Sequence, residues 1–159
     1  MDVKFLFPFV ISVNNVLPPL GFQSVTRDTF RPSISRMIRN RGVMVAIELF
    51  GTLRGYVIYN FNLNAARNIA EKMIAKTAII DSADIDDEMV KSAIGELGNI
   101  LAANATIILE GYGIMIDISP PKFFYGDINV PATNQIKHFV VNLKADNYEF
   151  ELNTLITKK

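Results

Sequence analysis

The stretch SAIGELGNILAANA, residues 92–105, decides how this chain is interpreted, because it has a helical pattern yet contains two glycines. Together with its flanks it predicts one long helix from about Asp86 to Leu109. Inside a helix, Gly95 and Gly98 each cost about 1 kcal/mol relative to alanine. A helix that only had to pack would carry Ala or Leu there, so the glycines raise the question of what the polar residues beside them do.

At 100° per residue, this helix has two contrasting faces. The buried face is predicted to be an apolar stripe made of Val90, Ile94, Leu97, Leu101, Ala105 and Ile108. The opposite face is a short polar row with the spacing i, i+4, i+7, i+11, made of Ser92, Glu96, Asn99 and Ala103. We expect Gly95, Gly98 and Ala102 to edge this row and to leave one flank of the helix nearly bare.

Two interpretations of the polar row are open. An exposed row is most often an ordinary solvated face, but such faces usually carry long, charged helix formers. A short polar row beside glycines instead lets another macromolecule approach the helix closely. Glu96 could then reach a cation of that partner, and the Asn99 amide could both donate and accept hydrogen bonds. The pair supplies no nucleophile, so its chemistry would be to complete another protein's active site.

Composition limits the chemistry available to the 159 residues. The 16 basic and 16 acidic residues balance, so no global field favours nucleic acid or an anionic membrane. The absence of cysteine excludes a disulfide framework and thiolate catalysis. The single histidine, His138, begins a strand-like run, which disfavours a Ser-His-Asp triad. No segment has the pattern of a hard-cation loop, so no metal site is expected.

The start of the chain predicts an amphipathic helix that ends at Pro18-Pro19. A signal peptide is the alternative, but the apolar run is short and no A-x-A cleavage site follows it. We therefore expect a cytoplasmic protein.

The remaining elements predict an α+β fold in a single domain over residues 1–159. Two β-hairpins are expected to turn at Gly51-Thr52 and at Asp146-Asn147. A strand that ends near Arg39 and another over residues 112–119 give an antiparallel sheet of about six strands with helices packed on it. The order of one helix, three strands, two helices and three strands suggests a loose internal duplication.

Two further segments complete this description. Asn62 or Asn64 is expected to cap the second helix. The segment 122–135, which contains the aromatic run KFFYGD, is expected to be a loop whose aromatic residues serve core or dimer packing.

The segment Ser92–Asn99 also matches the pattern [DS]-x3-E-x2-N of the CheC/CheX/FliY family of chemotaxis phosphatases. A proline follows the motif, and 20 residues separate Asn99 from Pro120 at the end of a predicted strand, as in that family. The chain is short and has one such motif, so it resembles the CheX branch most. It has no second motif on the first helix, because no glutamate stands three residues before Asn14 or Asn15.

The resemblance implies a CheC-like fold and a phosphatase that hydrolyses the aspartyl phosphate of a CheY-like response regulator. Asn99 would orient the attacking water, and Glu96 would pair with the active-site lysine of the regulator. Four further residues are expected to contact this partner: Ser92, Gly95, Gly98 and Ala103. The protein would need no cofactor of its own, since the regulator carries the Mg²⁺, and it would form a homodimer.

Three functional interpretations remain at this point. The first is the phosphatase, and the second is a non-catalytic CheC-like module that docks on a response regulator or a flagellar switch component. The third is an unrelated α+β adaptor with an accidental motif. The intact pair of Glu96 and Asn99 on one face favours the phosphatase. Many family members have glycine where this chain has Ala103, which is expected to narrow the approach of the partner slightly.

Overall fold

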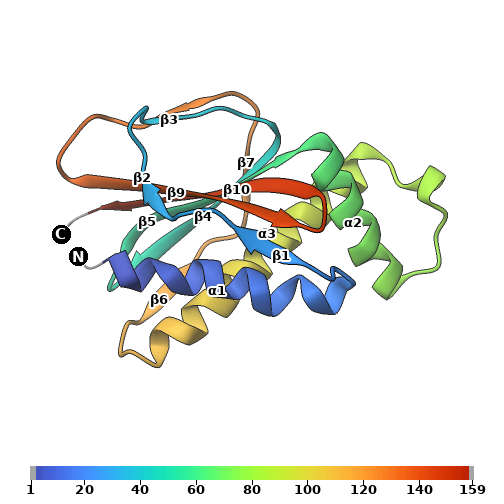
Figure 1. Ribbon diagram of the computed structural model, residues 1–159, viewed down its shortest axis with the longest axis horizontal. Helices are drawn as coiled ribbons and strands as arrows, with labels where there is room; N and C mark the ends of the chain where they lie inside the picture. The colour runs from blue at the N-terminus through green and yellow to red at the C-terminus, as the bar shows by residue number, and fades with distance from the viewer. Residues whose placement is uncertain (1–2, 158–159) are drawn as a thin grey trace.

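An eight-stranded antiparallel sheet forms the framework of the computed structural model, which describes residues 3–157 (Figure 1). The helices and 3-10 turns are η1 (Val3–Leu6), α1 (Phe7–Val16), η2 (Pro18–Leu20), α2 (Leu63–Thr77), η3 (Ser82–Asp84) and α3 (Asp87–Glu110). The strands are β1 (Val25–Arg27), β2 (Arg31–Pro32), β3 (Met37–Ile38), β4 (Gly42–Gly51), β5 (Arg54–Asn62), β6 (Ile116–Ile118), β7 (Lys122–Phe124), β8 (Ile128–Asn129), β9 (Ile136–Ala145) and β10 (Tyr148–Thr157).

The order of strands in the sheet interleaves the two halves of the chain. The path runs β1-β9-β10-β5-β4-β6, with β2 also paired to β9 and β7 also paired to β4. Each half supplies a helix that packs on the sheet, α1 or α3, and then a hairpin, and the two hairpins meet where β5 pairs with β10. The outer strands are exchanged, because β1 pairs with β9 and β6 pairs with β4. The predicted α+β fold with an antiparallel sheet is confirmed, and this arrangement agrees with a loose duplication.

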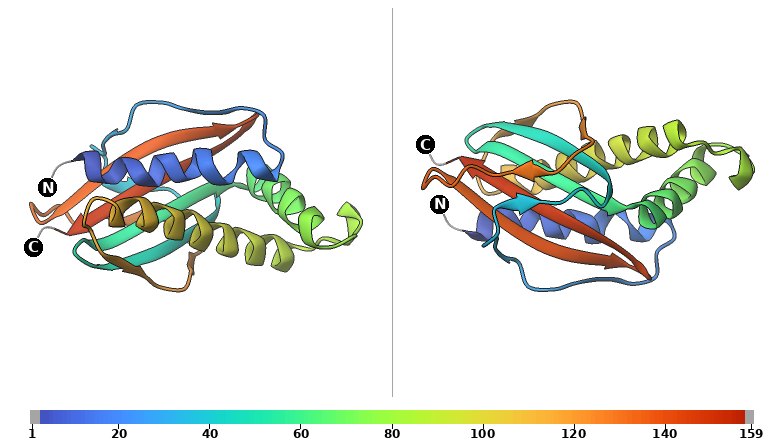
Figure 2. Two further views of the ribbon diagram at one scale, coloured as in Figure 1. Left: turned by 90° about the horizontal axis from the view of Figure 1, so that it is seen from below. Right: turned by 90° about the horizontal axis from the view of Figure 1, so that it is seen from above.

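Both faces of the sheet are covered. Helices α1 and α3 lie side by side across one face, while α2 extends beyond one end of the sheet (Figure 2). Val45, Ile47 and Leu49 of β4 belong to the core that lies under these helices. Met44 and Ala46 belong to a smaller cluster, which also contains residues of β3 and of the segment after β8. Burial on both faces explains why β4 is a nearly continuous apolar run rather than an alternating one.

The ends of the two longer helices follow the predicted capping chemistry. The Asp86 side chain accepts a hydrogen bond from Met89 N at 2.8 Å, and two further acidic residues occupy the first turn of α3. These negative charges favour the positive end of the helix dipole. Asn62, rather than Asn64, caps α2 by accepting from Ala65 N at 2.7 Å. By length and composition alone α3 could cross a membrane, but its apolar side packs in the core against the sheet.

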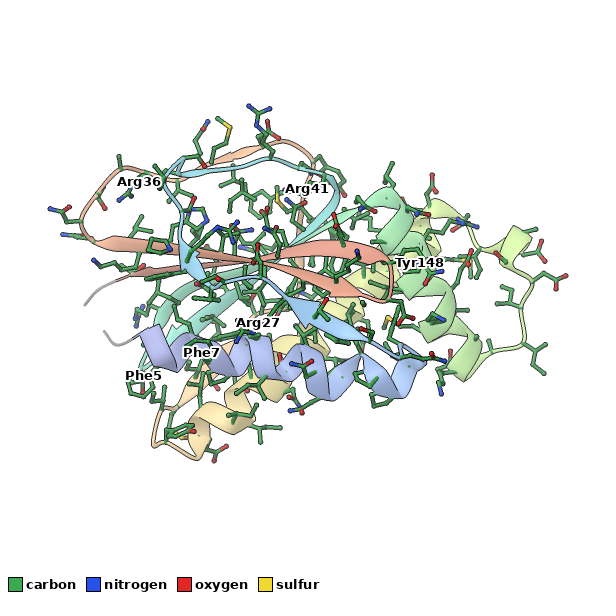
Figure 3. All side chains as sticks on the ribbon, in the orientation of Figure 1. Phe5, Phe7, Arg27, Arg36, Arg41 and Tyr148 are labelled. Atoms are coloured by element: carbon green, nitrogen blue, oxygen red, sulfur yellow. The ribbon has the colours of Figure 1, made fainter. Side chains whose placement is uncertain are left out.

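Aromatic rings from α1, from the segment between β1 and β2, and from β9 pack together and hold α1 against the sheet. Phe7 of α1 lies 5.8 Å from the ring of Phe30, which stacks at 5.7 Å on Phe139 of β9. The Arg27 guanidinium lies 5.8 Å from the centre of the Phe7 ring, and Figure 3 labels both residues. Phe9, another α1 residue, is fully buried. The predicted first helix is therefore a core element.

Two predicted segments differ from the structure. The expected strand that ends near Arg39 is broken into β2 and β3, because Pro32 cannot donate to a ladder and Arg36 adopts a left-handed φ of 51°. The segment expected as a loop over residues 122–135 contains β7, which extends the main sheet, and β8, which pairs with β3.

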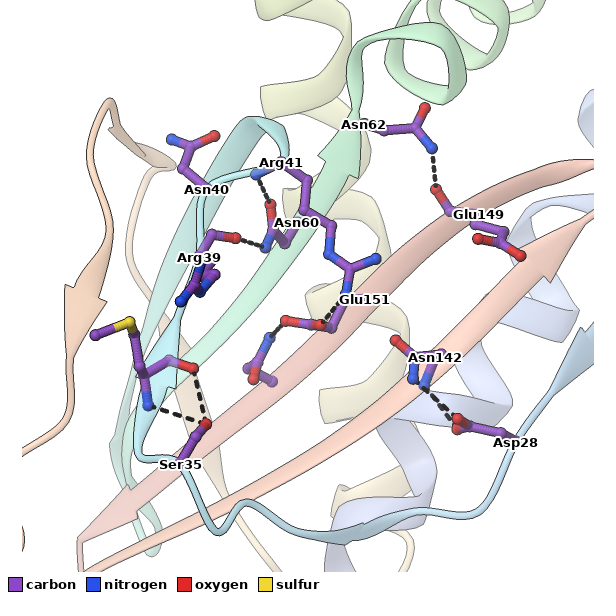
Figure 4. A network of polar contacts seen from close by, with 12 residues as sticks. Asp28, Ser35, Arg39, Asn40, Arg41, Asn60, Asn62, Asn142, Glu149 and Glu151 are labelled. Atoms are coloured by element: carbon purple, nitrogen blue, oxygen red, sulfur yellow. Dashed lines mark hydrogen bonds and ion pairs between the residues drawn. The ribbon is translucent and has the colours of Figure 1, made fainter.

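A side-chain amide fixes the chain between β3 and β4. Asn60 Nδ2 donates to Arg39 O at 2.6 Å, and Arg41 N donates to Asn60 Oδ1 at 3.1 Å (Figure 4). These bonds tie Arg39 and Arg41 to a β5 side chain just before β4 begins.

His138 lies in a buried polar chain rather than in a catalytic triad. Its Nε2 donates to Asn153 Oδ1 at 2.7 Å, because Asn153 Nδ2 donates to Glu151 at 2.7 Å and leaves the oxygen facing the ring. Glu151 also pairs with Arg41 at 3.2 Å (Figure 4). His138 Nδ1 is buried and has no partner among the described residues. Burial lowers the pKa of His138, because the charged form of the ring loses its hydration there.

This environment predicts a pH-dependent stability. The neutral ring is favoured in the folded state, so the unfolded chain binds a proton first as pH falls below the ordinary histidine pKa of 6.5. The stability that depends on neutral His138 is fully present above that pH and is lost as pH falls through the lower pKa of the folded state. Urea unfolding at pH values from about 7 to 5 should show a smaller decline for His138→Gln than for the wild type. Equal declines would contradict this assignment.

Candidate functional site

The polar row predicted on the long helix lies on the outward face of α3. Ser92 and Glu96 are exposed, whereas Asn99 and Ala103 are half-buried. On the opposite side, every residue of the predicted apolar stripe is buried except Ile108, which is half-buried. The two-faced character of the helix is therefore confirmed, with Glu96 and Asn99 one turn apart on the outer side.

The Glu96 carboxylate is free. It makes no hydrogen bond or ion pair with any residue of the described range 3–157, and it projects from an exposed position. It stands beside an open groove between α2 and α3 of about 420 Å³. The groove is mostly apolar and is lined by Met73, Ile74, Thr77, Met89, Ser92, Ala93 and Glu96. A partner seated here would meet both an apolar surface and an unpaired negative charge.

The Asn99 amide, in contrast, is anchored. Its Nδ2 donates to the backbone carbonyl of Ser119 at 3.0 Å, across the gap between α3 and the end of β6. Its Oδ1 accepts no hydrogen bond from the described part of the chain. The proline singled out in the sequence, Pro120, immediately follows Ser119. The spacing between Asn99 and Pro120 therefore reflects a real contact between α3 and the end of β6. The residue that makes this contact is Ser119, which the sequence pattern did not single out.

The expectation that the glycines leave the outer flank of the helix bare is wrong. Gly95 and Gly98 are both buried and face inward. A Cβ on Gly95 would lie 2.8 Å from Cζ of Phe123, and a Cβ on Gly98 would lie 3.2 Å from Cγ1 of Val45. The glycines are there because the sheet and the β7 segment approach the helix closely, leaving no room for a side chain. Ser92 and Ala103 remain available on the outer side.

The aromatic run after β6 contributes to this close packing. Phe123 is half-buried against α3, while Phe124 and Tyr125 are exposed. The Lys91 ammonium lies 4.9 Å from the centre of the Phe123 ring and 4.8 Å from that of Tyr125. It also donates to the Tyr125 hydroxyl, and this hydrogen bond raises the pKa of Lys91. The aromatic run therefore packs against the first half of α3, in agreement with the predicted role in core packing.

The described residues contain no group of three or more His, Asp or Glu side chains that could hold a metal ion. What the outer face of α3 offers is a free carboxylate, an amide with an open acceptor oxygen, and an apolar groove. Such groups can bind a cation, orient a water molecule and bury an apolar side chain of a partner.

Solved structures of chemotaxis proteins share this fold. The chain is similar to the chemotaxis protein CheX of Desulfovibrio desulfuricans, with a TM-score of 0.78, 17% identity, and coverage of 96% of this chain and 99% of that one. It is also similar to a chain in the crystal structure of the CheX-CheY-BeF3-Mg²⁺ complex from Borrelia burgdorferi. That match has a TM-score of 0.73 and 25% identity, and it covers 99% of this chain and 100% of that one.

Sequence comparison gives the family. The chain is 28% identical over 156 residues to the CheY-P phosphatase CheX of Thermotoga maritima, covering 96% of each protein. The family model described as chemotaxis phosphatase CheX matches residues 43–143. This chain belongs to the chemotaxis phosphatase CheX family. The matched segment begins with β4 and includes α3 with its outward pair.

The inward glycines predict an effect on folding. Leucine at position 98 would have to displace Val45 and Ile47, so Gly98→Leu should lower the free energy of unfolding by about 1–3 kcal/mol. Gly98→Ala should be close to neutral, since the gain in helix propensity offsets the tight contact. The matched control is Ser92→Leu on the exposed side of the same helix, which should change stability by less than about 0.5 kcal/mol. Equal denaturant midpoints for both leucine variants would contradict the inward orientation.

Proposed function

We propose that this protein is a phosphatase that hydrolyses the aspartyl phosphate of a CheY-like response regulator. The observation that carries the proposal is the pairing of an unpaired Glu96 carboxylate with the anchored Asn99 amide, one turn apart on the outer face of α3. The relative from Thermotoga maritima is named as a CheY-P phosphatase, and a similar chain occurs in a complex with CheY. Both relationships support the same partner class.

In the proposed reaction, Asn99 orients the attacking water. Its open Oδ1 accepts one hydrogen of the water and directs the lone pair of the water toward phosphorus. A bond forms between the water oxygen and phosphorus, and the bond from phosphorus to the aspartyl oxygen breaks. The electron pair leaves with the aspartate as a carboxylate, while the water proton passes to the phosphate product or to solvent. This step requires no nucleophile from the chain, which suits a protein without cysteine.

Glu96 would fix the docking register by pairing with the active-site lysine of the regulator. An unpaired, exposed carboxylate is suited to this role because it has no internal contact to break. We propose that the regulator also carries the Mg²⁺, which neutralises the phosphoryl oxygens, and that this chain contributes no cofactor.

The surface around the pair would complete the contact. Ser92 lies one turn before Glu96, and Ala103 lies one turn after Asn99. The groove between α2 and α3 provides apolar area beside the charged pair. Because Ala103 is half-buried, its methyl group should narrow the approach only slightly relative to glycine.

The decisive test is the decay of a CheY-like regulator phosphorylated on its aspartate, measured with and without this protein. Wild-type protein should accelerate the decay, and Asn99→Ala should remove roughly 100-fold or more of that acceleration, since it removes the group that positions the water. Glu96→Ala should chiefly weaken binding and raise KM, because it removes a docking contact.

A control variant makes the comparison specific. Glu110→Ala removes an exposed carboxylate from the last turn of the same helix, and it should leave the decay unchanged. Binding that depends on Glu96 without faster decay would identify a non-catalytic docking module instead. Full activity of Asn99→Ala would overturn the assigned role of Asn99.

We further propose that the protein acts as a cytoplasmic homodimer. The β6 and β7 strands form an edge of the sheet, and the exposed side chains of Met115, Phe124 and Tyr125 lie at or beside it. Such an edge favours coverage by another chain.

Sedimentation equilibrium at micromolar concentration tests the dimer. The mass should be twice that of one chain, and Phe124→Glu should lower it, because a charge at the edge opposes burial. As a control, Ile79→Glu, at an exposed position after α2, should leave the mass unchanged. A wild-type protein with the mass of one chain would contradict the proposed assembly.

A further inference from the structure

The last rung between β4 and β6 is irregular. The register pairs Leu49 with Ile118, so Glu48 and Ser119 face each other at the next position. Two such residues in a hydrogen-bonded antiparallel pair exchange two backbone bonds. The first bond is present, with Ser119 N donating to Glu48 O at 3.0 Å. In the second, Glu48 N donates at 2.9 Å to the Ser119 hydroxyl rather than to the Ser119 carbonyl.

The hydroxyl therefore takes the place of the backbone carbonyl in the sheet. Its own proton is donated to Pro120 O at 2.8 Å, so an oxygen lone pair is left to face Glu48 N–H. The proline also restricts the backbone of Ser119 to an extended conformation. The Ser119 carbonyl is consequently released from the ladder, and it accepts the Asn99 amide at 3.0 Å.

This contact determines which end of the Asn99 amide faces outward. A carbonyl oxygen can only accept a hydrogen bond, so the NH₂ group of Asn99 must face it. The flipped amide would place two acceptor oxygens about 3 Å apart with no proton between them, which is unfavourable. Asn99 Oδ1 is thereby held on the open side of α3.

We propose that Ser119 is a positioning residue for Asn99. By taking over the ladder bond with its side chain, Ser119 frees its backbone carbonyl to set the orientation of the Asn99 amide. The inference rests on the proposed function, in which the outward Oδ1 is the atom that orients the water. Ser119 lies outside the Ser92–Asn99 motif, and its role gives a physical reason for the spacing between Asn99 and Pro120.

Substitution at this position separates the hydroxyl from the carbonyl. In Ser119→Ala the Glu48 N–H loses its acceptor and should form the regular hydrogen bond to the carbonyl of residue 119 instead. The Asn99 amide would then lose its acceptor and be free to change orientation. We expect kcat for regulator dephosphorylation to fall roughly tenfold with KM unchanged. Ser119→Thr keeps the hydroxyl and should restore most of kcat.

The control is Thr52→Ala, which removes a comparable bond at the other end of the same strand pair, where Met115 N donates to Thr52 Oγ1 at 3.3 Å. This variant should leave kcat unchanged. A comparable fall in kcat for Thr52→Ala, or a wild-type kcat for Ser119→Ala, would overturn the proposal.

A second measurement does not depend on activity. The Asn99 side-chain amide signal, assigned by its loss in Asn99→Ala, should be protected from hydrogen exchange in the wild type and in Ser119→Thr. Protection should be lost in Ser119→Ala, and its retention there would overturn the proposal. If the wild type does not accelerate decay of the phosphorylated regulator, the proposed function fails. The exchange measurement still decides whether Ser119 fixes the orientation of the Asn99 amide.

Discussion

The close contact between α3 and β4 is the constraint on which the rest of the structure depends. Two positions of α3 have no side chain, so the helix backbone lies directly on Val45 of β4 and on Phe123 of the β7 segment. That contact buries the apolar stripe and sets the rotation of the helix. Because the rotation is set from the inside, Glu96 and Asn99 lie on the outer face of α3, where Asn99 is also held by its hydrogen bond to Ser119 O. Packing in the core thus directs these two residues outward.

The sequence predicted the faces of α3, the two hairpins and the caps, because these follow from local periodicity and turn chemistry. It did not predict which way Gly95 and Gly98 face, since small residues at the border of an apolar stripe are compatible with either side. Their direction depends on partners distant in the chain. The short strands β3 and β8 were also missed, because two residues carry no periodic signal. The contact of Asn99 with Ser119 could be suspected only from a family spacing, since no local rule connects a helix residue to a carbonyl 20 positions away.

The two halves of the fold are alike in architecture and unlike in chemistry. Helix α1 occupies a place beside α3 on the same face of the sheet, yet most of its residues from Pro8 to Val13 are buried, and its Ser12 hydroxyl donates to Phe9 O within the helix. Asn15 near its end donates to Asn104 of α3 at 3.1 Å, so it serves helix packing. The first half therefore stabilises the layer on which the second half presents its outward row.

The exchanged outer strands have a consequence for how the protein folds and unfolds. Because β1 completes the hairpin of the other half and β6 does the same in return, neither half can bury its own sheet edge alone. These pairings join residues that are distant in the chain, such as Val25 with Ala145 and Leu49 with Ile118. Contacts of such long range slow folding, since the entropy of closing a long loop is lost before the pairing forms. The same interlocking favours loss of structure in one cooperative step, so a fragment that carries α3 without the first half would lack the support that keeps its outer face in place.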